Sequence, residues 1–270
     1  MKNWIKCAPA ALVAVAVAGC SATTDTTSAP SGETTHKASS APDNPNAGVT
    51  LTQTDVGRLV ADPKGLKGAA ITIAGKAFNV EGDGTFQMWA DSGANHNIAV
   101  CCDASVEEDQ YVKVKGTVAG DVSGENAFGG EVSAPMVDAD AVTPATAAAL
   151  DPAMWKLRGQ SVTENGVRIR VSKIEFGRHE VRMYVNVKND GADSFDVDPS
   201  PAVVSGGHQV ETDYSGDYKE LASTVSPGSS TRGVLLFKRS DVALRKPLSV
   251  SFSGYDSDFN ELAWRFAWNS

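Results

Sequence analysis

Apolar and polar residues alternate with a period of two along much of the chain from residue 70 onward. The alternation is clearest in VRMYVNVKN, residues 181–189, and in ELAWRFAW, residues 261–268. Successive side chains of a strand point to opposite faces, so this pattern is typical of strands with one face on a hydrophobic core. Segments rich in Gly, Asp and Asn, such as EGDGT at residues 81–85, interrupt the alternation and favour turns. The pattern therefore predicts an all-β fold.

The first folded region opens with a short helix expected within residues 52–62 and capped by Thr52 or Thr54. Five strand-like runs follow, at residues 70–80, 85–91, 97–104, 111–121 and 131–142. The features that carry a resemblance are the glycines of residues 65–68, the runs ITIAGKAFNV and YVKVKGTVAG, and the cysteine-bearing run between them. Through these features, residues 50–145 resemble an OB-like exported family related to the tRNA-anticodon-binding fold. The resemblance implies a small five-stranded barrel with a short helix.

The second folded region, residues 159–270, also consists of alternating runs separated by turn-forming segments. Its alternation shifts phase at Ser172 and Lys173, which predicts a β-bulge. Short strands at this spacing favour a β-sandwich of about seven strands. The stretches MYVNVKNDGADSFDVDPS, SPGSSTRGVLLF and LSVSF resemble a telokin-like, immunoglobulin-type domain of bacterial lipoproteins. The resemblance implies an immunoglobulin-like β-sandwich and supplies no catalytic residue.

The N-terminus has the pattern of a secretory leader. Lys2 and Lys6 precede an uncharged run of 12 residues, 8–19, which is too short to span a bilayer as a helix. The run ends in the residues Val17, Ala18, Gly19 and Cys20 and so resembles a bacterial lipobox. The resemblance implies that the Cys20 thiol is alkylated with diacylglycerol and that the chain is cut before it. Two acyl chains would then hold the protein on the extracytoplasmic face of the cell membrane. The alternative is a plain secretory signal followed by a chance cysteine.

Residues 21–48 contain no aromatic residue and almost no large aliphatic residue. Such a segment cannot bury enough apolar surface to offset the entropy of ordering it, so we expect a disordered tether. A stretch of small residues bracketed by prolines precedes the second folded region and is expected to be a linker. The expected organisation is a signal peptide at residues 1–19, the lipidated cysteine and tether at 20–48, an OB-like domain at 49–143, a linker at 144–158 and an immunoglobulin-like sandwich at 159–270.

Charge is unevenly divided between the two folded regions. Residues 48–145 carry six Lys or Arg against fourteen Asp or Glu, a net charge of −8, whereas residues 146–270 carry 15 against 16. A groove for single-stranded nucleic acid needs a positive track beside its stacking aromatics. The region that resembles a nucleic-acid-binding fold is the acidic one, so we expect no nucleic-acid partner. Protein or oligosaccharide contacts are the other common uses of such a barrel.

Cys101 and Cys102 are adjacent in an expected strand. Strand geometry would place Cys102 on the core face with Ile98 and Val100, and Cys101 on the opposite face. One buried and one half-exposed cysteine is the first interpretation. The alternative is a vicinal disulfide, which an oxidising extracytoplasmic location would favour. A disulfide requires strict geometry, which counts against this alternative.

Sequence patterns of catalysis are missing from the chain. The motifs G-x-S-x-G, S-x-x-K and H-E-x-x-H do not occur. Acidic clusters such as Asp256, Asp258 and Glu261 do not have the spacing of a calcium-binding loop, and turn chemistry accounts for them. We therefore expect no catalytic residue, no metal site and no cofactor.

Trp89 is the one aromatic residue singled out as a candidate contact. It lies in the second of the five expected strands, and in an OB-like barrel this strand belongs to the usual binding surface. Its position alternates with Phe86 and Met88, so it falls on the face opposite to theirs. The sequence does not decide which of the two faces is the core.

These features together predict a lipid-anchored, extracytoplasmic, non-enzymatic binding or adaptor protein of the bacterial cell envelope. Its expected partners are the membrane, through the anchor, and an envelope protein or a glycan. The alternative is a ligand-binding lipoprotein that serves a transporter or a sensor. A well-formed apolar pocket between the two folded regions would favour that alternative.

Overall fold

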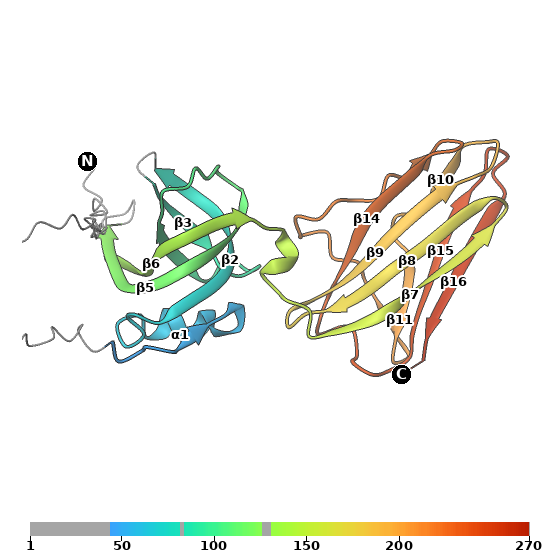
Figure 1. Cartoon of the computed structure of the whole chain (residues 1–270). Helices are drawn as coiled ribbons and strands as arrows, with labels where there is room; N and C mark the ends of the chain where they lie inside the picture. The colour runs from blue at the N-terminus through green and yellow to red at the C-terminus, as the bar shows by residue number, and fades with distance from the viewer. Residues whose placement is uncertain (1–43, 82–83, 126–130, 270) are drawn as a thin grey trace, which may run out of the picture.

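The computed structural model describes residues 44–81, 84–125 and 131–269. Strands dominate these residues and form two groups, each around its own hydrophobic core (Figure 1). The predicted all-β fold class is confirmed, since a small closed barrel with one short helix is followed by a β-sandwich. The part of the chain that the structure describes contains no helix long and apolar enough to cross a membrane.

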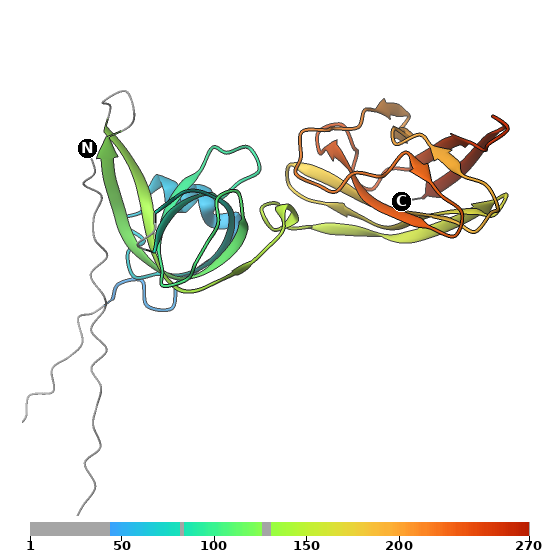
Figure 2. The same cartoon turned by 90° about the horizontal axis from the view of Figure 1, so that it is seen from above.

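Five strands close into the barrel seen end-on in Figure 2: β2 (Ala70–Glu81), β3 (Thr85–Trp89), β4 (Asn97–Cys101), β5 (Tyr111–Glu125) and β6 (Glu131–Pro144). β2 pairs with β3, β3 with β4, β4 with β6 and β6 with β5, and β5 returns to β2. The β4–β6 pair is parallel and the other four pairs are antiparallel. A short strand, β1 (Thr50–Leu51), adds to β2 in parallel. The predicted five-stranded OB-like barrel is therefore present.

A short helix packs on this barrel where the sequence predicts one. A 3₁₀ turn, η1 (Gln53–Asp55), leads directly into α1 (Val56–Ala61). Of the two candidate caps it is Thr52 that begins the helix, and its backbone N–H donates to Asp55 Oδ2 at 2.9 Å. The apolar face of α1 is buried in the barrel core through Val56 and Leu59.

Residues 44–48 form a turn that is attached to the barrel, although the sequence pattern assigned them to the tether. The Asn46 side-chain amide donates to the Gly65 carbonyl at 2.9 Å and to the Lys67 carbonyl at 2.8 Å. The asparagine side chain thus supplies hydrogen bonds in a segment that has little apolar surface to bury. The preceding part of the expected tether lies outside the described residues.

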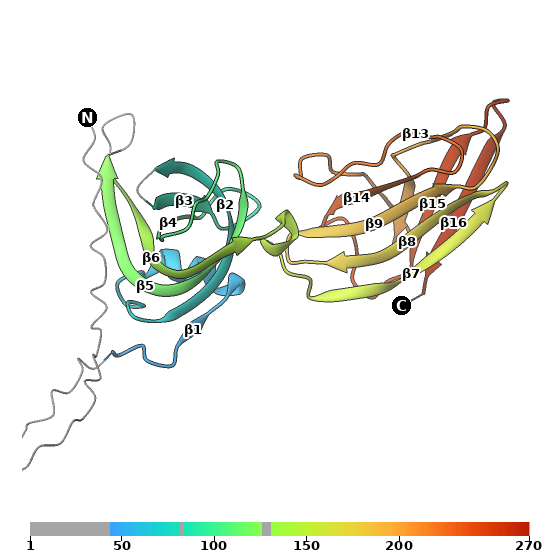
Figure 3. The same ribbon diagram turned by 45° about the horizontal axis from the view of Figure 1, so that its top comes forward.

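Two sheets make up the sandwich. One contains β14 (Ser230–Lys238), β9 (Glu180–Asn189), β8 (Val167–Phe176) and β7 (Trp155–Glu164), in that order. The other contains β12 (His208–Val210), β11 (Ala202–Ser205), β15 (Leu248–Tyr255), β10 (Phe195–Val197) and β13 (Thr224–Val225), with β16 (Glu261–Trp268) also paired to β15. Figure 3 shows the two sheets face to face. The strand segments number ten rather than about seven, because four of them are only two to four residues long.

The sandwich core follows the alternation read from the sequence. In β9, the buried residues are Val181, Met183, Val185 and Val187. Trp264 of β16 is completely buried, and its indole N–H donates to the Val167 carbonyl at 3.1 Å. The register between β8 and β9 shifts between Val171 and Lys173, which confirms the predicted bulge.

The connection between barrel and sandwich is shorter than the expected linker at residues 144–158. β6 continues to Pro144, a 3₁₀ turn follows (η2, Ala147–Ala149), and β7 already begins at Trp155. The sequence pattern predicted no strand before residue 167 and so missed β7, whose alternation is interrupted at Gly159. A side chain at Gly159 would collide with the Ser172 carbonyl, so this position in β7 needs a glycine opposite the bulge in β8.

Candidate functional site

Trp89 lies on the outer face of the barrel. The sequence did not decide which face of this strand is the core, and the structure shows that it is the face opposite Trp89. Phe86 and Met88 point into the core, and Trp89 is half-buried on the opposite side of β3. Its indole stacks on the ring of Phe78 in β2, with ring centroids 4.4 Å apart and planes at 10°. Phe78 was not predicted as part of a site, because only the pairing of β2 with β3 brings it beside Trp89.

The stacked pair borders a hollow between barrel and sandwich with a cavity volume of about 310 Å³. The barrel contributes Lys76, Phe78, Trp89, Asp91, Asp109 and Tyr111, and the sandwich contributes Glu180, Asp217 and Tyr218. Ala147 and Leu150 of the connection also line it. The sandwich residues come mainly from the loop between β12 and β13, which projects toward the barrel (Figure 3). We call this cavity the junction hollow.

A small ionic cluster bridges barrel and sandwich at the junction hollow. Lys76 Nζ lies 2.7 Å from Asp217 Oδ2 and 3.2 Å from Asp109 Oδ1. The Tyr111 hydroxyl donates to the same Asp217 oxygen at 2.8 Å. The hydrogen bond that Lys76 donates to Asp217 lowers the pKa of Asp217 and raises the pKa of Lys76. The Asp217 side chain is half-exposed, so the contribution of this bridge to stability is modest.

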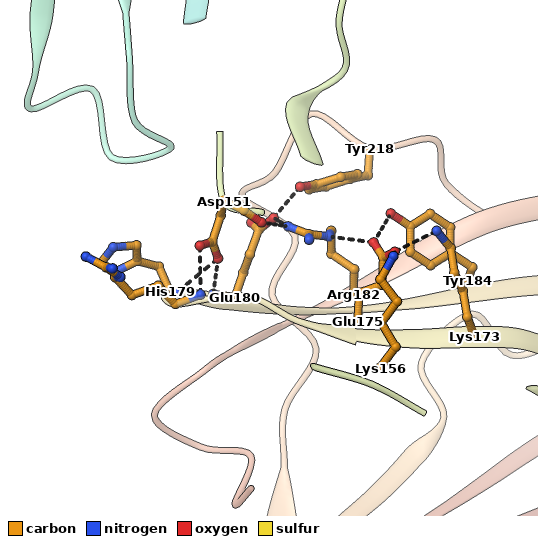
Figure 4. Close-up of polar contacts among 10 residues, drawn as sticks. Asp151, Lys156, Lys173, Glu175, His179, Glu180, Arg182, Tyr184 and Tyr218 are labelled. Carbon is orange, nitrogen blue, oxygen red and sulfur yellow. Dashed lines mark hydrogen bonds and ion pairs between the residues drawn. The ribbon is translucent and has the colours of Figure 1, made fainter. Parts of the chain in front are cut away.

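Asp151 ties the connection to the sandwich. Its buried carboxylate accepts backbone N–H groups from Arg178, His179 and Glu180 at 2.7, 2.9 and 3.0 Å (Figure 4). These donors lie in the turn between β8 and β9 and at the first residue of β9, and the turn is thereby fixed against the connection. A side chain at Gly177 would collide with the Asp151 carboxylate, which explains the glycine in this turn.

A buried arginine lies between two glutamates on the outer face of the β14–β9–β8–β7 sheet. Arg182 of β9 is 1% exposed. Its Nη1 lies 2.5 Å from Glu180 Oε1 and also donates to the Asp151 carbonyl at 2.8 Å. Its Nε lies 3.5 Å from Glu175 Oε2. The Tyr218 hydroxyl, which lines the junction hollow, donates to Glu180 as well (Figure 4). Desolvation of a buried guanidinium is costly, and its carboxylate partners offset that cost.

Glu175 collects three further donors on the far side of Arg182. Lys173 and Lys156 place their ammonium groups 2.8 and 2.9 Å from Glu175 Oε1, and the Tyr184 hydroxyl donates to Oε2 at 2.9 Å. Burial alone would raise the pKa of Glu175, but these hydrogen bonds lower it to about 2. The Tyr184 pKa rises to about 12, first through burial and then through its bond to Glu175. Glu175 is thus held ionised and is unsuited to accept a proton near neutral pH.

Within residues 44–81, 84–125 and 131–269 no group of three or more His, Cys, Asp or Glu residues could hold a metal ion. The Asp256 carboxylate accepts the backbone N–H groups of Asp258 and Asn260 at 3.0 and 2.9 Å, which confirms its predicted role in a turn. The junction hollow is bordered by the stacked Phe78–Trp89 pair and by side chains that can form hydrogen bonds.

The two adjacent cysteines do not form the vicinal disulfide considered from the sequence, because Cys102 is free. Cys102 packs against the barrel core together with Ile98 and Val100, as strand alternation predicts. Extended backbone directs neighbouring side chains to opposite faces, so their sulfur atoms are held apart. Burial raises the pKa of the Cys102 thiol.

The lipobox residues Val17, Ala18, Gly19 and Cys20 lie outside the described residues.

Comparison with known proteins yields little. No family model and no curated protein matches the chain. Among solved structures, the GAE domain of yeast GGA1 matches 42% of this chain over 100% of its own length, with 10% identity and a TM-score of 0.26. The GAE domain of GGA2p from Saccharomyces cerevisiae matches 42% of this chain over 97% of its length, with 10% identity and a TM-score of 0.27. Scores this low support no conclusion about shared fold or function.

Proposed function

We propose that this chain is a lipid-anchored, extracytoplasmic, non-enzymatic binding or adaptor protein of the bacterial cell envelope. Its partner is an envelope protein or a glycan, contacted at the junction hollow. The anchor rests on the resemblance of residues 17–20 to a lipobox, and the two folded regions rest on their resemblance to exported OB-like and telokin-like domains. The observation that carries the binding proposal is the stacked Phe78–Trp89 pair at the edge of the hollow.

Aromatic side chains with this placement are suited to recognition. A half-buried indole offers a large rigid apolar surface and loses little conformational entropy on contact, so tryptophan is enriched among residues that dominate binding energy. Lys76, Asp109 and Tyr111 lie beside it and can supply directional hydrogen bonds. Glu175 faces Arg182, and its hydrogen bonds to Lys173, Lys156 and Tyr184 hold it ionised, which favours a non-enzymatic role.

Photo-crosslinking in cells tests this proposal. A photoreactive residue replaces Ser92, an exposed residue at the rim of the hollow, in the full-length chain. The same residue replaces exposed Thr163 of β7 as a control. We expect one envelope component to be crosslinked from position 92 only. Its recovery is expected to fall in a Cys20→Ala chain, which cannot be lipidated.

A matched pair of aromatic substitutions locates the contact. Trp89→Ala removes the stacked indole, whereas Tyr255→Ala removes an exposed aromatic side chain that does not line the hollow. The crosslink is expected to disappear with the first substitution and to persist with the second. A crosslink that forms equally from positions 92 and 163, or a crosslink that survives Trp89→Ala, would contradict the proposed site.

A small ligand is the second candidate, and the cavity itself favours it. Its volume of about 310 Å³ is at the lower end of the range of small-molecule sites. Native mass spectrometry of the protein extracted from membranes tests this candidate. A bound mass present in the native chain and absent from Trp89→Ala would favour the ligand-binding alternative over the adaptor.

A further inference from the structure

A second hollow lies on the outer face of the sandwich, over strands β14, β9 and β8. Its cavity volume is about 530 Å³, and one side is formed by Lys219 in the loop between β12 and β13. Four cationic side chains line it, those of Arg170, Lys173, Lys219 and Arg232, and no Asp or Glu side chain does. We call this cavity the basic groove.

Strand register places the two arginines side by side. Asn186 of β9 is opposite Arg170 of β8 and also opposite Arg232 of β14. The three residues therefore form one row across the sheet, and their side chains share its outer face. Adjacent strands are about 4.8 Å apart, so the Cα atoms of the two arginines are separated by about 10 Å. Tyr184 and Lys173 form the next row of the groove.

Most of these cations have no carboxylate partner. Among the described residues, Arg170, Lys219 and Arg232 take part in no salt bridge. In contrast, Arg168 and Lys188, which are paired two residues further along these strands, both form salt bridges with the Asp190 carboxylate. The chain as a whole has a net charge of −9. A concave surface with uncompensated positive charge focuses its field and attracts anions.

We propose that the basic groove binds a linear phosphate-bearing chain. A guanidinium group presents a planar fork of donors that matches a phosphate group in bidentate geometry, and two such forks across one row can hold successive phosphates. The groove is recessed, and the large exposed apolar residues of the described chain, such as Met154, Tyr214 and Phe259, do not line it. A flat membrane surface is therefore a poorer fit than a single extended anionic chain. This inference is independent of the junction hollow.

Calorimetric titration of the full-length chain with sodium tripolyphosphate at low salt tests the proposal. The groove variant is Arg170→Gln with Arg232→Gln. The control variant, Arg178→Gln with Arg265→Gln, removes two exposed arginines outside the groove and changes the net charge equally. We expect the groove variant to lose at least about tenfold in affinity, which corresponds to the loss of one good charged contact, and the control to change less than about threefold.

Three results would overturn the proposal: no binding by the native chain, equal losses in both double variants, or tighter binding of citrate than of tripolyphosphate. A further measurement tests binding of the chain to vesicles of phosphatidylglycerol. Binding to them that depends on Arg170 and Arg232, without binding to tripolyphosphate, would replace the proposal with a membrane contact. Should the groove double variant not fold, Lys219→Gln changes only a loop side chain and is expected to weaken tripolyphosphate binding in the same direction.

Discussion

Replacement of Glu175 by glutamine tests the buried charge network directly. The substitution keeps the shape of the side chain and removes the charge that faces Arg182, Lys173 and Lys156. The Glu175 pKa is lowered from 4.5 to about 2, which corresponds to about 3 kcal/mol in favour of the folded state. The Lys156 and Lys173 side chains are 59% and 42% exposed, so solvent screens part of this energy. We expect a loss of about 2 kcal/mol at pH 7.

The pH dependence of that loss separates charge from shape. A carboxyl group whose pKa is lower in the folded state stabilises the fold fully above its unfolded pKa of 4.5, and the stabilisation is lost as the pH falls toward 2. Glutamine does not titrate. The difference in unfolding free energy between the native chain and Glu175→Gln is therefore expected to be constant above pH 5 and to shrink below it.

Urea unfolding followed by tryptophan fluorescence measures this difference, because three of the five tryptophans, at positions 155, 264 and 268, lie in the sandwich. Glu164→Gln is the matched control, since Glu164 is exposed on the same sheet and takes part in no salt bridge with the described residues. Equal losses in the two variants, or a gap for Glu175→Gln that does not change between pH 7 and acidic pH, would refute the reasoning.

Three further predictions concern Asp151, the Lys76–Asp217 bridge and Cys102. Asp151→Ala is expected to lower the unfolding free energy by about 3 kcal/mol in urea titrations, because three backbone N–H groups lose a charged acceptor; a loss below about 1 kcal/mol would contradict this role. A double-mutant cycle of Lys76→Gln and Asp217→Asn is expected to give a coupling below about 1 kcal/mol that shrinks in high salt, and a larger, salt-independent value would show a stronger bridge than the exposure implies. Cys102 is expected to react with iodoacetamide more slowly than a free cysteine peptide at pH 8.5, as followed by mass spectrometry, whereas equal rates would contradict its burial.

Alternation with a period of two determined most of the fold. It predicted the five barrel strands, the inward residues of β9 and β16, and the bulge at Ser172, because strand geometry is local and the core repeats on every second residue. It missed β7, where Gly159 interrupts the pattern opposite that bulge. The length of the connection between barrel and sandwich was overestimated for the same reason.

Tertiary structure alone decided the sites. Both faces of β3 carry apolar residues, so only the closure of the barrel shows that Phe86 and Met88 are core and that Trp89 is outside. The partners of Trp89 in the junction hollow come from segments more than a hundred residues apart, and Asp217 has no local pattern that marks it. The basic groove is likewise assembled across three strands and a loop. A sequence determines which face a residue shares with its neighbours along the strand. Which other strands and loops meet that face depends on pairing between distant segments, and that pairing exists only in the folded chain.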